Sequence, residues 1–312
     1  MKRLLGVFFA VALVAAALAA WGGAASGKSP EAAAPASPAA ADQKRKRLPP
    51  LPREVRQRKR WNIGIKCDAP PFGYIDFRGN HAGFEVDIAR WFSRFAFGSP
   101  RRITFVCSPT PSREPNLTTG RVDIMLATFT YTTDRETRID FSRAYYKATG
   151  RLLVRKDSPI RSLNDIRGRS ISTTSGSIYD RWMRRCFTNT TPLVTDSFTN
   201  ALLAFRQGRA EALMWDDTVL VGVDAQEPDF KLTNDKFLAL PYGIGIRQGN
   251  TAMKRWVDSR LEIMRKRDLF RKLLRNHIPA SRLPDFSGNI LRPKNTFGYA
   301  RPGTPSADTV CP

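Results

Sequence analysis

The chain has 312 residues, 42% of them hydrophobic, so it exceeds the usual size of one domain and has enough apolar residues for sizeable cores. We expect two lobes, or one large domain with a disordered extension. The formal net charge of +23 permits contact with anionic polymers or lipid head groups, although a soluble arginine-rich surface is the simpler interpretation. With only His81 and His277 and no C-x-x-C motif, the spacing supports no Cys/His metal site, and we expect no cofactor.

The N-terminus has the pattern of an export signal. Lys2 and Arg3 precede an uninterrupted apolar run over residues 4–20. The run ends like a bacterial lipoprotein signal, but Trp21 stands where the lipid-accepting cysteine belongs, which excludes that lipidation. We expect residues 1–21 to be a cleaved signal peptide. Retention as an anchor is the alternative, because the run is just long enough to span a bilayer.

A basic linker is predicted to follow. Residues 22–60 are rich in Ala, Pro, Ser, Lys and Arg and show no apolar period, which is typical of a disordered tether. Nine basic residues and one acid, Glu54, lie between Lys44 and Arg60. We expect this run to be attracted to the anionic envelope surface, with a solvated linker as the alternative. The fold should begin at Trp61.

Strand-like and helical patterns alternate from Trp61 to about residue 150, which indicates parallel β-structure with crossover helices. The expected strands are residues 62–66, 102–107 and 122–126. A helix is expected over residues 84–95, where apolar residues recur on one face of a 3.6-residue period. That face comprises Phe84, Ile88, Trp91, Phe92 and Phe95. We interpret it as core.

A second α/β block follows Gly150. Strands are expected at residues 151–154, 169–173, 193–194 and 210–215, with a helix at 199–206 and a later strand at 240–246. Two amphipathic helices are then predicted, over residues 251–266 and 269–276. After Pro279 the composition turns to Pro, Ser, Gly and Thr, and the tail is expected to be irregular.

Several motifs recur in a fixed order along the chain. They are residues 64–68 with 70–74, the sequence Gly-Phe-Glu-Val-Asp-Ile-Ala at 83–89, and residues 122–146, 163–168, 210–217 and 241–246. In residues 122–146, a strand end, a threonine pair and an arginine precede Asp-Phe-Ser-x-x-Tyr-Tyr. In these motifs residues 61–279 resemble the polar-amino-acid branch of family 3 of the bacterial extracellular solute-binding proteins.

The resemblance implies an α/β fold of the two-lobed periplasmic-binding-protein type II, with two parallel-rich sheets and a two-strand hinge. Residues 61–150 and a return segment, 241–279, would form lobe 1, residues 151–240 lobe 2, and residues 280–312 a C-terminal tail. The resemblance also implies an exported, non-enzymatic monomer. It would close on glutamate, aspartate, glutamine or asparagine and deliver it to the permease of an ABC importer.

A free amino acid carries a carboxylate and an ammonium on one carbon, so a selective site needs a planar cation and a carboxylate. Arg135 follows Thr128 and Thr130 at a strand end, where open α/β sheets bind ligands, and offers a bidentate fork to the α-carboxylate. Asp216, at a strand end in the second lobe, is the candidate for the ammonium, because that charge is costly to bury unpaired. Asp217 is the alternative, although an Asp after a strand ordinarily caps a helix.

The resemblance adds further contacts. Thr174, Gly176 and Ser177 lie in a loop whose N–H groups and hydroxyls would contact the ligand carboxylate, with a plain strand-to-helix turn as the alternative. Asp68 would contact the ligand with its side chain. Phe72 would stack on the ligand, or else is a buried plug of its loop. Amide-selective members carry lysine where this chain has Thr174, which leaves the ligand's side chain open.

Four cysteines in an exported chain indicate disulfides, and counting alone allows three pairings. Cys67 and Cys107 end two strands that should be neighbours, which makes their pairing a hypothesis. Cys186 and Cys311 would then tie the tail to the second lobe.

The lobes are expected to hinge about residues 149–153 and 242–246 and to close when a ligand contacts both. A sensor that signals to a membrane kinase is an alternative function. A dehydratase of prephenate-like acids is another, but no spacing singles out a carboxylate as its general acid. No nucleic-acid partner is expected, because the exported chain lacks an aromatic-basic platform.

Overall fold

The computed structural model describes residues 48–300 and 304–312. The predicted signal peptide and the beginning of the basic run, within residues 1–47, lie outside the described residues. In the described part of the chain, no helix combines the length and the apolar character needed to cross a membrane.

Residues 48–60 contain a packed helix, which corrects the expectation of a disordered tether for this part of the predicted linker, whereas residues 22–47 lie outside the described residues. Helix α1 (Arg53–Arg58) forms there, and its Val55 is fully buried in the hydrophobic core. The neighbouring Glu54 accepts a hydrogen bond of 3.1 Å from the Asn250 amide. One buried valine anchors this helix, and a single apolar residue leaves no periodic signal in the sequence.

A five-stranded sheet with the order β5-β1-β6-β14-β7 forms lobe 1. Its strands are β1 (Trp61–Ile65), β5 (Ile103–Cys107), β6 (Ile124–Leu126), β7 (Ile139–Phe141) and β14 (Gly245–Arg247). β5, β1 and β6 run parallel, whereas β14 is antiparallel to β6 and β7. A small antiparallel sheet follows β1, comprising β2 (Asp68–Ala69), β3 (Gly73–Ile75) and β4 (His81–Ala82).

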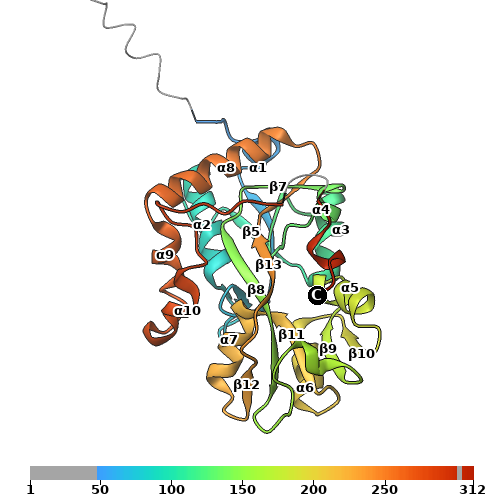
Figure 1. The fold of residues 1–312 in the computed structure, drawn as a ribbon. Coiled ribbons are helices and arrows are strands. Elements are labelled where there is room, and N and C mark those ends of the chain that lie inside the picture. The colour runs from blue at the N-terminus through green and yellow to red at the C-terminus, as the bar shows by residue number, and fades with distance from the viewer. Residues whose placement is uncertain (1–47, 301–303) are drawn as a thin grey trace, which may run out of the picture. The chain divides into compact units, whose positions relative to one another are not determined.

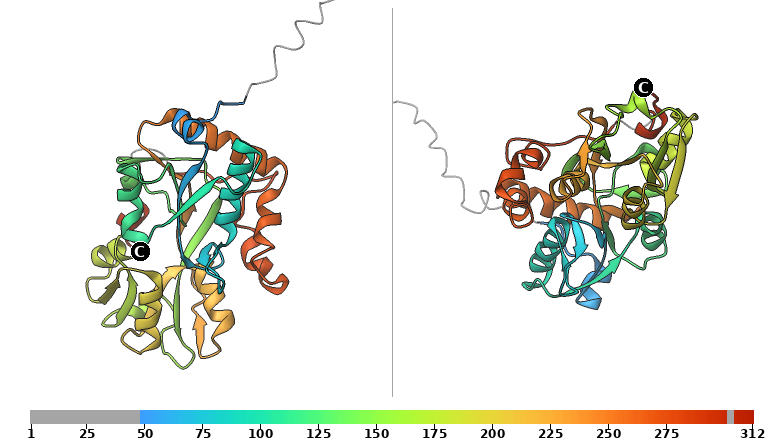
Figure 2. Two further views of the ribbon diagram at one scale, coloured as in Figure 1. Left: turned by 180° about the vertical axis from the view of Figure 1, so that it is seen from behind. Right: turned by 90° about the horizontal axis from the view of Figure 1, so that it is seen from below.

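The helices of lobe 1 cover both sides of this sheet, with α2 and α9 on one side and α3 and α4 on the other (Figures 1 and 2). They are α2 (Phe84–Phe97), η3 (Thr110–Ser112), α3 (Arg113–Thr118), α4 (Thr133–Glu136), α8 (Thr251–Lys266) and α9 (Leu269–Leu274). On α2 the predicted apolar face packs into the core, although Trp91 and Phe95 are only partly buried.

A second sheet forms lobe 2, with the order β10-β9-β11-β8-β12 and β13 paired to β8. Its strands are β8 (Tyr146–Arg155), β9 (Ser170–Thr174), β10 (Thr191–Thr195), β11 (Ala212–Asp216), β12 (Phe230–Leu232) and β13 (Phe237–Tyr242). Its helices are η4 (Leu163–Ile166), α5 (Ile178–Cys186), α6 (Phe198–Arg206) and α7 (Asp217–Gln226). The predicted two-lobed α/β fold is thereby confirmed, but the expectation of parallel-rich sheets is wrong, because both sheets are mixed and β8 is antiparallel to β11, β12 and β13.

Two antiparallel strands, β8 and β13, connect the lobes (Figure 1). β8 pairs with β13 up to Gly150 and with β11 from Gly150 onwards. The single strand expected at residues 240–246 is two strands, β13 and β14, with Gly243 in the break. A Cβ atom on Gly243 would lie 2.1 Å from the Tyr299 hydroxyl, so any other residue there would force the Tyr299 side chain to move.

Most of the described C-terminal tail lacks regular secondary structure, as expected, but the tail includes short helical segments and packs against the rest of the chain. The helical segments are η5 (Ala280–Arg282), α10 (Leu283–Ser287) and η6 (Ala307–Thr309). Ile290 is buried and forms an antiparallel bridge with Tyr146 of β8. The tail therefore packs against the rest of the chain in spite of its content of Pro, Ser and Gly. The sequence does not predict this packing, because the buried apolar residues of the tail are too far apart to give a periodic signal.

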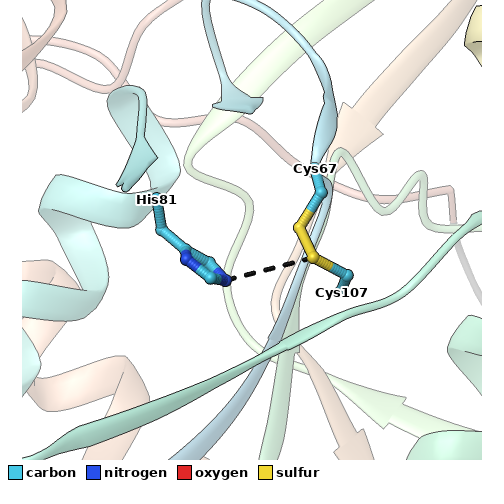
Figure 3. Close-up of side chains that lie close together, drawn as sticks. All are labelled: Cys67, His81 and Cys107. Atoms are coloured by element: carbon cyan, nitrogen blue, oxygen red, sulfur yellow. Dashed lines mark hydrogen bonds between the residues drawn. A yellow bond between two sulfur atoms is a disulfide. The ribbon is translucent and has the colours of Figure 1, made fainter. Parts of the chain in front are cut away.

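The two disulfides suggested by the sequence are both present, Cys67–Cys107 with a Cα–Cα distance of 5.5 Å and Cys186–Cys311 with 5.2 Å. The His81 ring points at the first disulfide, with its Nε2 4.0 Å from Sγ of Cys107 (Figure 3). Although these three side chains lie close together, the sulfurs are bonded to each other, so the cluster offers no thiolate to a metal.

Candidate functional site

Polar side chains from both lobes meet at one small cavity. Lobe 1 contributes Arg113, Thr128, Thr130 and Arg135, and lobe 2 contributes Ser177, Ile178, Tyr179, Trp215 and Asp216. Five residues of the predicted site are among them, whereas Asp68, Phe72, Thr174 and Gly176 are not. The cation and the carboxylate expected from different lobes therefore share one cavity.

Arg135 lines the cavity, but each nitrogen of its guanidinium already has a partner in the protein. Nε pairs with a carboxylate oxygen of Glu114 at 3.3 Å. Nη1 donates to the Thr130 carbonyl at 2.8 Å, and Nη2 to the Gly176 carbonyl of lobe 2 at 3.1 Å. Burial, followed by repulsion from Arg113, lowers the pKa of Arg135 to about 9. Three of the five N–H donors of Arg135 thus have acceptors in the described structure, and one N–H on each of Nη1 and Nη2 remains for a ligand.

Arg113 is a second buried guanidinium, which the sequence analysis missed. Its Nε donates to the Thr110 carbonyl at 3.3 Å, and its Nη1 to the carbonyls of Ala127 and Thr128 at 3.1 Å. Within residues 48–300 and 304–312, its Nη2 has no acceptor and the guanidinium forms no ion pair. Burial lowers the pKa of Arg113, and the charge of Asp216 opposes this shift. Arg113 is thus a desolvated cation that still has a donor free.

Asp216 ends β11 and is 5% exposed. Its Oδ1 accepts a hydrogen bond of 2.5 Å from the Tyr179 hydroxyl, and its Oδ2 accepts one from the Tyr242 hydroxyl. Burial raises its pKa to about 6, although the two hydroxyls and Arg113 act in the opposite direction and Asp217 adds to the rise. No described cation lies within ion-pair distance of Asp216, so an incoming ammonium would supply the missing counter-charge.

Asp217 has a different role from its neighbour. Its carboxylate accepts hydrogen bonds from the backbone N–H and the hydroxyl of Thr149, at 3.2 and 2.7 Å. Thr149 belongs to β8, one of the two strands that connect the lobes. Asp217 therefore fixes the start of α7 against the connecting strand, which disfavours the alternative that it binds the ammonium.

Asp68 joins the lobes away from the cavity. One carboxylate oxygen pairs with Lys66 at 2.8 Å, and the other accepts a hydrogen bond of 3.0 Å from the backbone N–H of Phe198, the first residue of α6. Lys66 is fully buried, and burial lowers its pKa while Asp68 opposes that shift. Asp68 thus contacts lobe 2 itself, in the place of the predicted ligand contact.

Phe72 is fully buried and packs edge-on against Phe84, Tyr146 and Tyr242, with ring centroids 5.0–6.0 Å apart. Phe72 thus fills the core beneath its loop, which is the alternative considered above. Its ring is covered by other side chains of the protein and is not available to stack on a ligand.

The loop that precedes α5 contributes one residue to the cavity. Ser177 lines it and also caps α5, accepting a hydrogen bond of 3.1 Å from the Asp180 N–H. Thr174 is fully buried, and its hydroxyl has no hydrogen-bond partner in the described structure. Gly176 contributes its carbonyl to Arg135. The loop therefore contacts lobe 1 as well as forming the cavity wall.

Glu85 supports the lobe 1 wall from behind. It accepts a 2.7 Å hydrogen bond from the backbone N–H of Thr128 and another from the Tyr145 hydroxyl. Thr128 has a φ of +45°, a left-handed conformation that is uncommon for a β-branched residue. Burial raises the pKa of Glu85 to about 7. The carboxylate of Glu85 thus holds Thr128 in the strained conformation that lines the cavity.

Comparisons with known proteins agree with this geometry. A model of the family described as bacterial extracellular solute-binding proteins, family 3, matches residues 61–280. The glutamine-binding protein of Geobacillus stearothermophilus is 30% identical over 194 residues, which cover 62% of this chain and 74% of that protein. The ABC transporter glutamine-binding protein GlnH of Bacillus subtilis is 29% identical over 205 residues, which cover 65% and 75%.

Solved structures share the fold. The cysteine-binding protein of Campylobacter jejuni superimposes with a TM-score of 0.71 at 28% identity, covering 73% of this chain and 92% of that one. The solute receptor for L-cysteine of Neisseria gonorrhoeae does so with the same TM-score at 26% identity, covering 74% and 93%.

Proposed function

The chain belongs to family 3 of the bacterial extracellular solute-binding proteins, and from this premise we propose that it binds a free amino acid between its lobes and delivers it to an ABC importer. It acts outside the cytoplasm, as the family does. The relatives above are named as binding proteins, which supports a role in binding without catalysis. A test for phenylpyruvate release from prephenate is expected to be negative.

The observation that carries the proposal is a pair of opposite buried charges that form no ion pair in the described structure. Arg113 from lobe 1 and Asp216 from lobe 2 are both about 95% buried, line the same cavity and lack ion pairs in the described structure. A buried charge without a counter-ion is costly, so such a pair is expected where a ligand completes it. The α-carboxylate would bind Nη2 of Arg113, and the ammonium would bind the carboxylate of Asp216.

We propose an acidic amino acid as the preferred ligand, ahead of its amide. The guanidinium groups of Arg113 and Arg135 lie 4.7 and 5.0 Å from the ring centroid of Phe129, so two cations adjoin one cavity. In the described structure, Glu114 is the carboxylate that pairs with Arg135, and it also pairs with Arg138, so it only partly balances these two cations. A second ligand carboxylate is therefore more favourable here than a neutral amide, and Thr128 would add its hydroxyl.

Isothermal titration with each of the twenty amino acids tests this proposal. We expect micromolar or tighter binding of glutamate or aspartate and weaker binding of the amides. Arg113→Gln should weaken binding more than a hundredfold, because breaking a buried charge pair costs roughly 3–5 kcal/mol. Arg121→Gln, at an exposed arginine of the same lobe, is the matched control and should bind normally. The proposal is wrong if no amino acid binds or if Arg113→Gln binds as tightly as the unaltered protein.

Two finer proposals concern the chain's location. We propose that residues 1–21 are removed on export, and that the basic residues from Lys44 to Arg60 attract the protein to anionic lipid. Helix α1 supports the second proposal, since its Arg53 and Arg56 are exposed and form no ion pair in the described structure. Mass spectrometry of exported protein tests the first. Sedimentation with vesicles containing or lacking anionic lipid tests the second.

A further inference from the structure

The disulfide of lobe 1 and the imidazole of His81 form a compact group of three metal-ligating side chains (Figure 3). The sulfurs of Cys67 and Cys107 and a ring nitrogen of His81 lie within 4.8 Å of one another. In the oxidised form the sulfurs are bonded to each other and bind no metal. Two thiolates and an imidazole are nevertheless a ligand set that zinc takes in proteins. Reduction is therefore the step that separates this group from a metal site.

Elements of lobe 1 hold each of the three side chains. Cys107 is the last residue of β5 and lies opposite Ile65 of β1, and Cys67 follows two residues after Ile65. The two cysteines therefore leave the sheet at the same edge, with their Cα atoms 5.5 Å apart. His81 begins β4 and pairs with Ile75 of β3. The small sheet thus places the imidazole beside the edge of the main sheet.

Contacts of His81 orient its ring toward the sulfurs. The ring stacks on Phe105 of β5, with centroids 5.0 Å apart and planes inclined by 20°. The His81 carbonyl accepts a hydrogen bond of 2.9 Å from Nη2 of Arg90. Nη1 of Arg90 pairs with Asp87 at 2.8 Å, which reduces the repulsion between this guanidinium and a cation at the cluster. The imidazole is therefore held in place before any metal binds.

A tetrahedral zinc ion requires only small movements of these atoms. Zinc–sulfur distances of about 2.3 Å and a zinc–nitrogen distance of about 2.0 Å place the sulfurs about 3.8 Å apart and the nitrogen about 3.5 Å from each sulfur. Nε2 of His81 is 4.0 Å from Sγ of Cys107, which is about 0.5 Å more than that geometry needs. Once the S–S bond is broken, rotation about the Cα–Cβ bonds separates the sulfurs while the strands stay in place.

We propose that reduction of the Cys67–Cys107 disulfide creates a zinc site with Cys67, Cys107 and His81 as its protein ligands. The reductant is a dithiol. Its first thiolate attacks Sγ of Cys107, the exposed cysteine of the pair, and Cys67 leaves as a thiolate. Its second thiolate displaces Cys107, so the dithiol becomes a disulfide and the protein gains two thiols. Zinc binding releases their two protons, and water takes the fourth position.

The fold does not depend on this disulfide alone. β1 and β5 pair over five residues, and beyond their ends the N–H of Ser108 donates to the Ile65 carbonyl at 2.8 Å. We therefore expect the reduced protein to keep the three side chains together. None of them lines the cavity that contains Arg113 and Asp216. The zinc site is thus independent of the proposed function, and its test needs no amino acid.

Cobalt titration tests the site, because Co²⁺ reports thiolate ligands and tetrahedral geometry in its absorption spectrum. Cys186→Ser with Cys311→Ser is the parent variant, since it removes the second disulfide, where the described part of the chain has no such group of three. After reduction with a phosphine in the absence of oxygen, we expect it to bind one equivalent of Co²⁺ with an intense thiolate-to-cobalt band. Before reduction it should bind none. Zn²⁺ should displace the bound Co²⁺.

Variants of the three ligands complete the test. Adding Cys67→Ser and Cys107→Ser to the parent should abolish the band, and adding His81→Ala should weaken Co²⁺ binding about tenfold or more. Circular dichroism of each sample checks the fold, and Zn²⁺ should raise the melting temperature of the reduced parent but not of the oxidised one. The zinc site is refuted if reduction unfolds the parent, if the reduced parent binds no Co²⁺, or if His81→Ala binds Co²⁺ as tightly as the parent.

Discussion

The buried carboxylate of Asp216 should make the ligand-free protein less stable at neutral pH than a variant with a neutral side chain at this position. Burial raises its pKa from 3.8 to about 6, so carrying the ionised form at pH 7.5 costs about 3 kcal/mol. Asp216→Asn removes that charge. The amide oxygen can accept from only one of Tyr179 and Tyr242, so the other hydroxyl must turn to accept from the amide NH₂, a rearrangement that costs about 1 kcal/mol. The net expectation is a stabilisation of about 2 kcal/mol together with a loss of amino-acid binding.

The pH dependence of the stabilisation by Asp216→Asn follows from the direction of the pKa shift of Asp216. Because the pKa of Asp216 in the folded state exceeds the unfolded value, the penalty is absent below about pH 4 and develops as the pH rises through about 6. Asp216→Asn should therefore unfold at higher urea than the unaltered protein at pH 7.5. At pH 4 the advantage should vanish, leaving at most the cost of the rearranged hydrogen bonds.

Urea unfolding of the ligand-free protein at both pH values measures the effect, and titration with amino acids measures binding. Asp157→Asn is the matched control, because Asp157 is exposed. It should change neither stability nor affinity. The reasoning is refuted if Asp216→Asn is less stable at pH 7.5, if its gain is the same at pH 4, or if it binds the ligand normally.

Three further predictions follow from the site and its supports. Ligand affinity should fall about tenfold per pH unit below pH 6, as Asp216 becomes protonated in the ligand-free protein; calorimetry that finds equal affinity at pH 7 and pH 5 would contradict this. Glu85→Ala should destabilise the protein by about 1–3 kcal/mol, because the buried N–H of Thr128 loses its acceptor, whereas Glu85→Gln should retain most of the stability; equal urea midpoints for the two variants would count against that support. Gly243→Ala should destabilise by about 1–3 kcal/mol through its clash with Tyr299, and Tyr299→Phe, which removes the clashing hydroxyl, should relieve most of that cost, as thermal unfolding would report.

The sequence predicts long elements well and short ones poorly. The helix expected at residues 251–266 is α8 with those bounds, because sixteen residues give several turns of apolar periodicity. Helix α1 has six residues and one buried side chain, too few for a pattern. The break between β13 and β14 is where the chain passes from the sheet of lobe 2 to that of lobe 1, and the residue pattern does not record this change of pairing partner.

The site shows the same limit. Sequence motifs lead to Asp216 and Arg135, because Asp216 ends β11 and Arg135, in α4, follows the threonine pair that comes after β6. What these side chains contact depends on tertiary packing. Arg135 is bonded to Glu114, 21 residues away, and to the carbonyl of Gly176, 41 residues away. Arg113 has no distinctive neighbours in sequence among 51 basic residues, and only its burial without a carboxylate partner sets it apart.

The hydrogen bond from Nη2 of Arg135 to the Gly176 carbonyl bridges the two lobes through the protein's own atoms. It therefore stabilises the arrangement of the lobes seen here without any help from a solute. A solute that bound the remaining N–H groups of Arg135 would add to an existing bridge, so binding would shift the balance between open and closed lobes by less than if the solute supplied every contact between them.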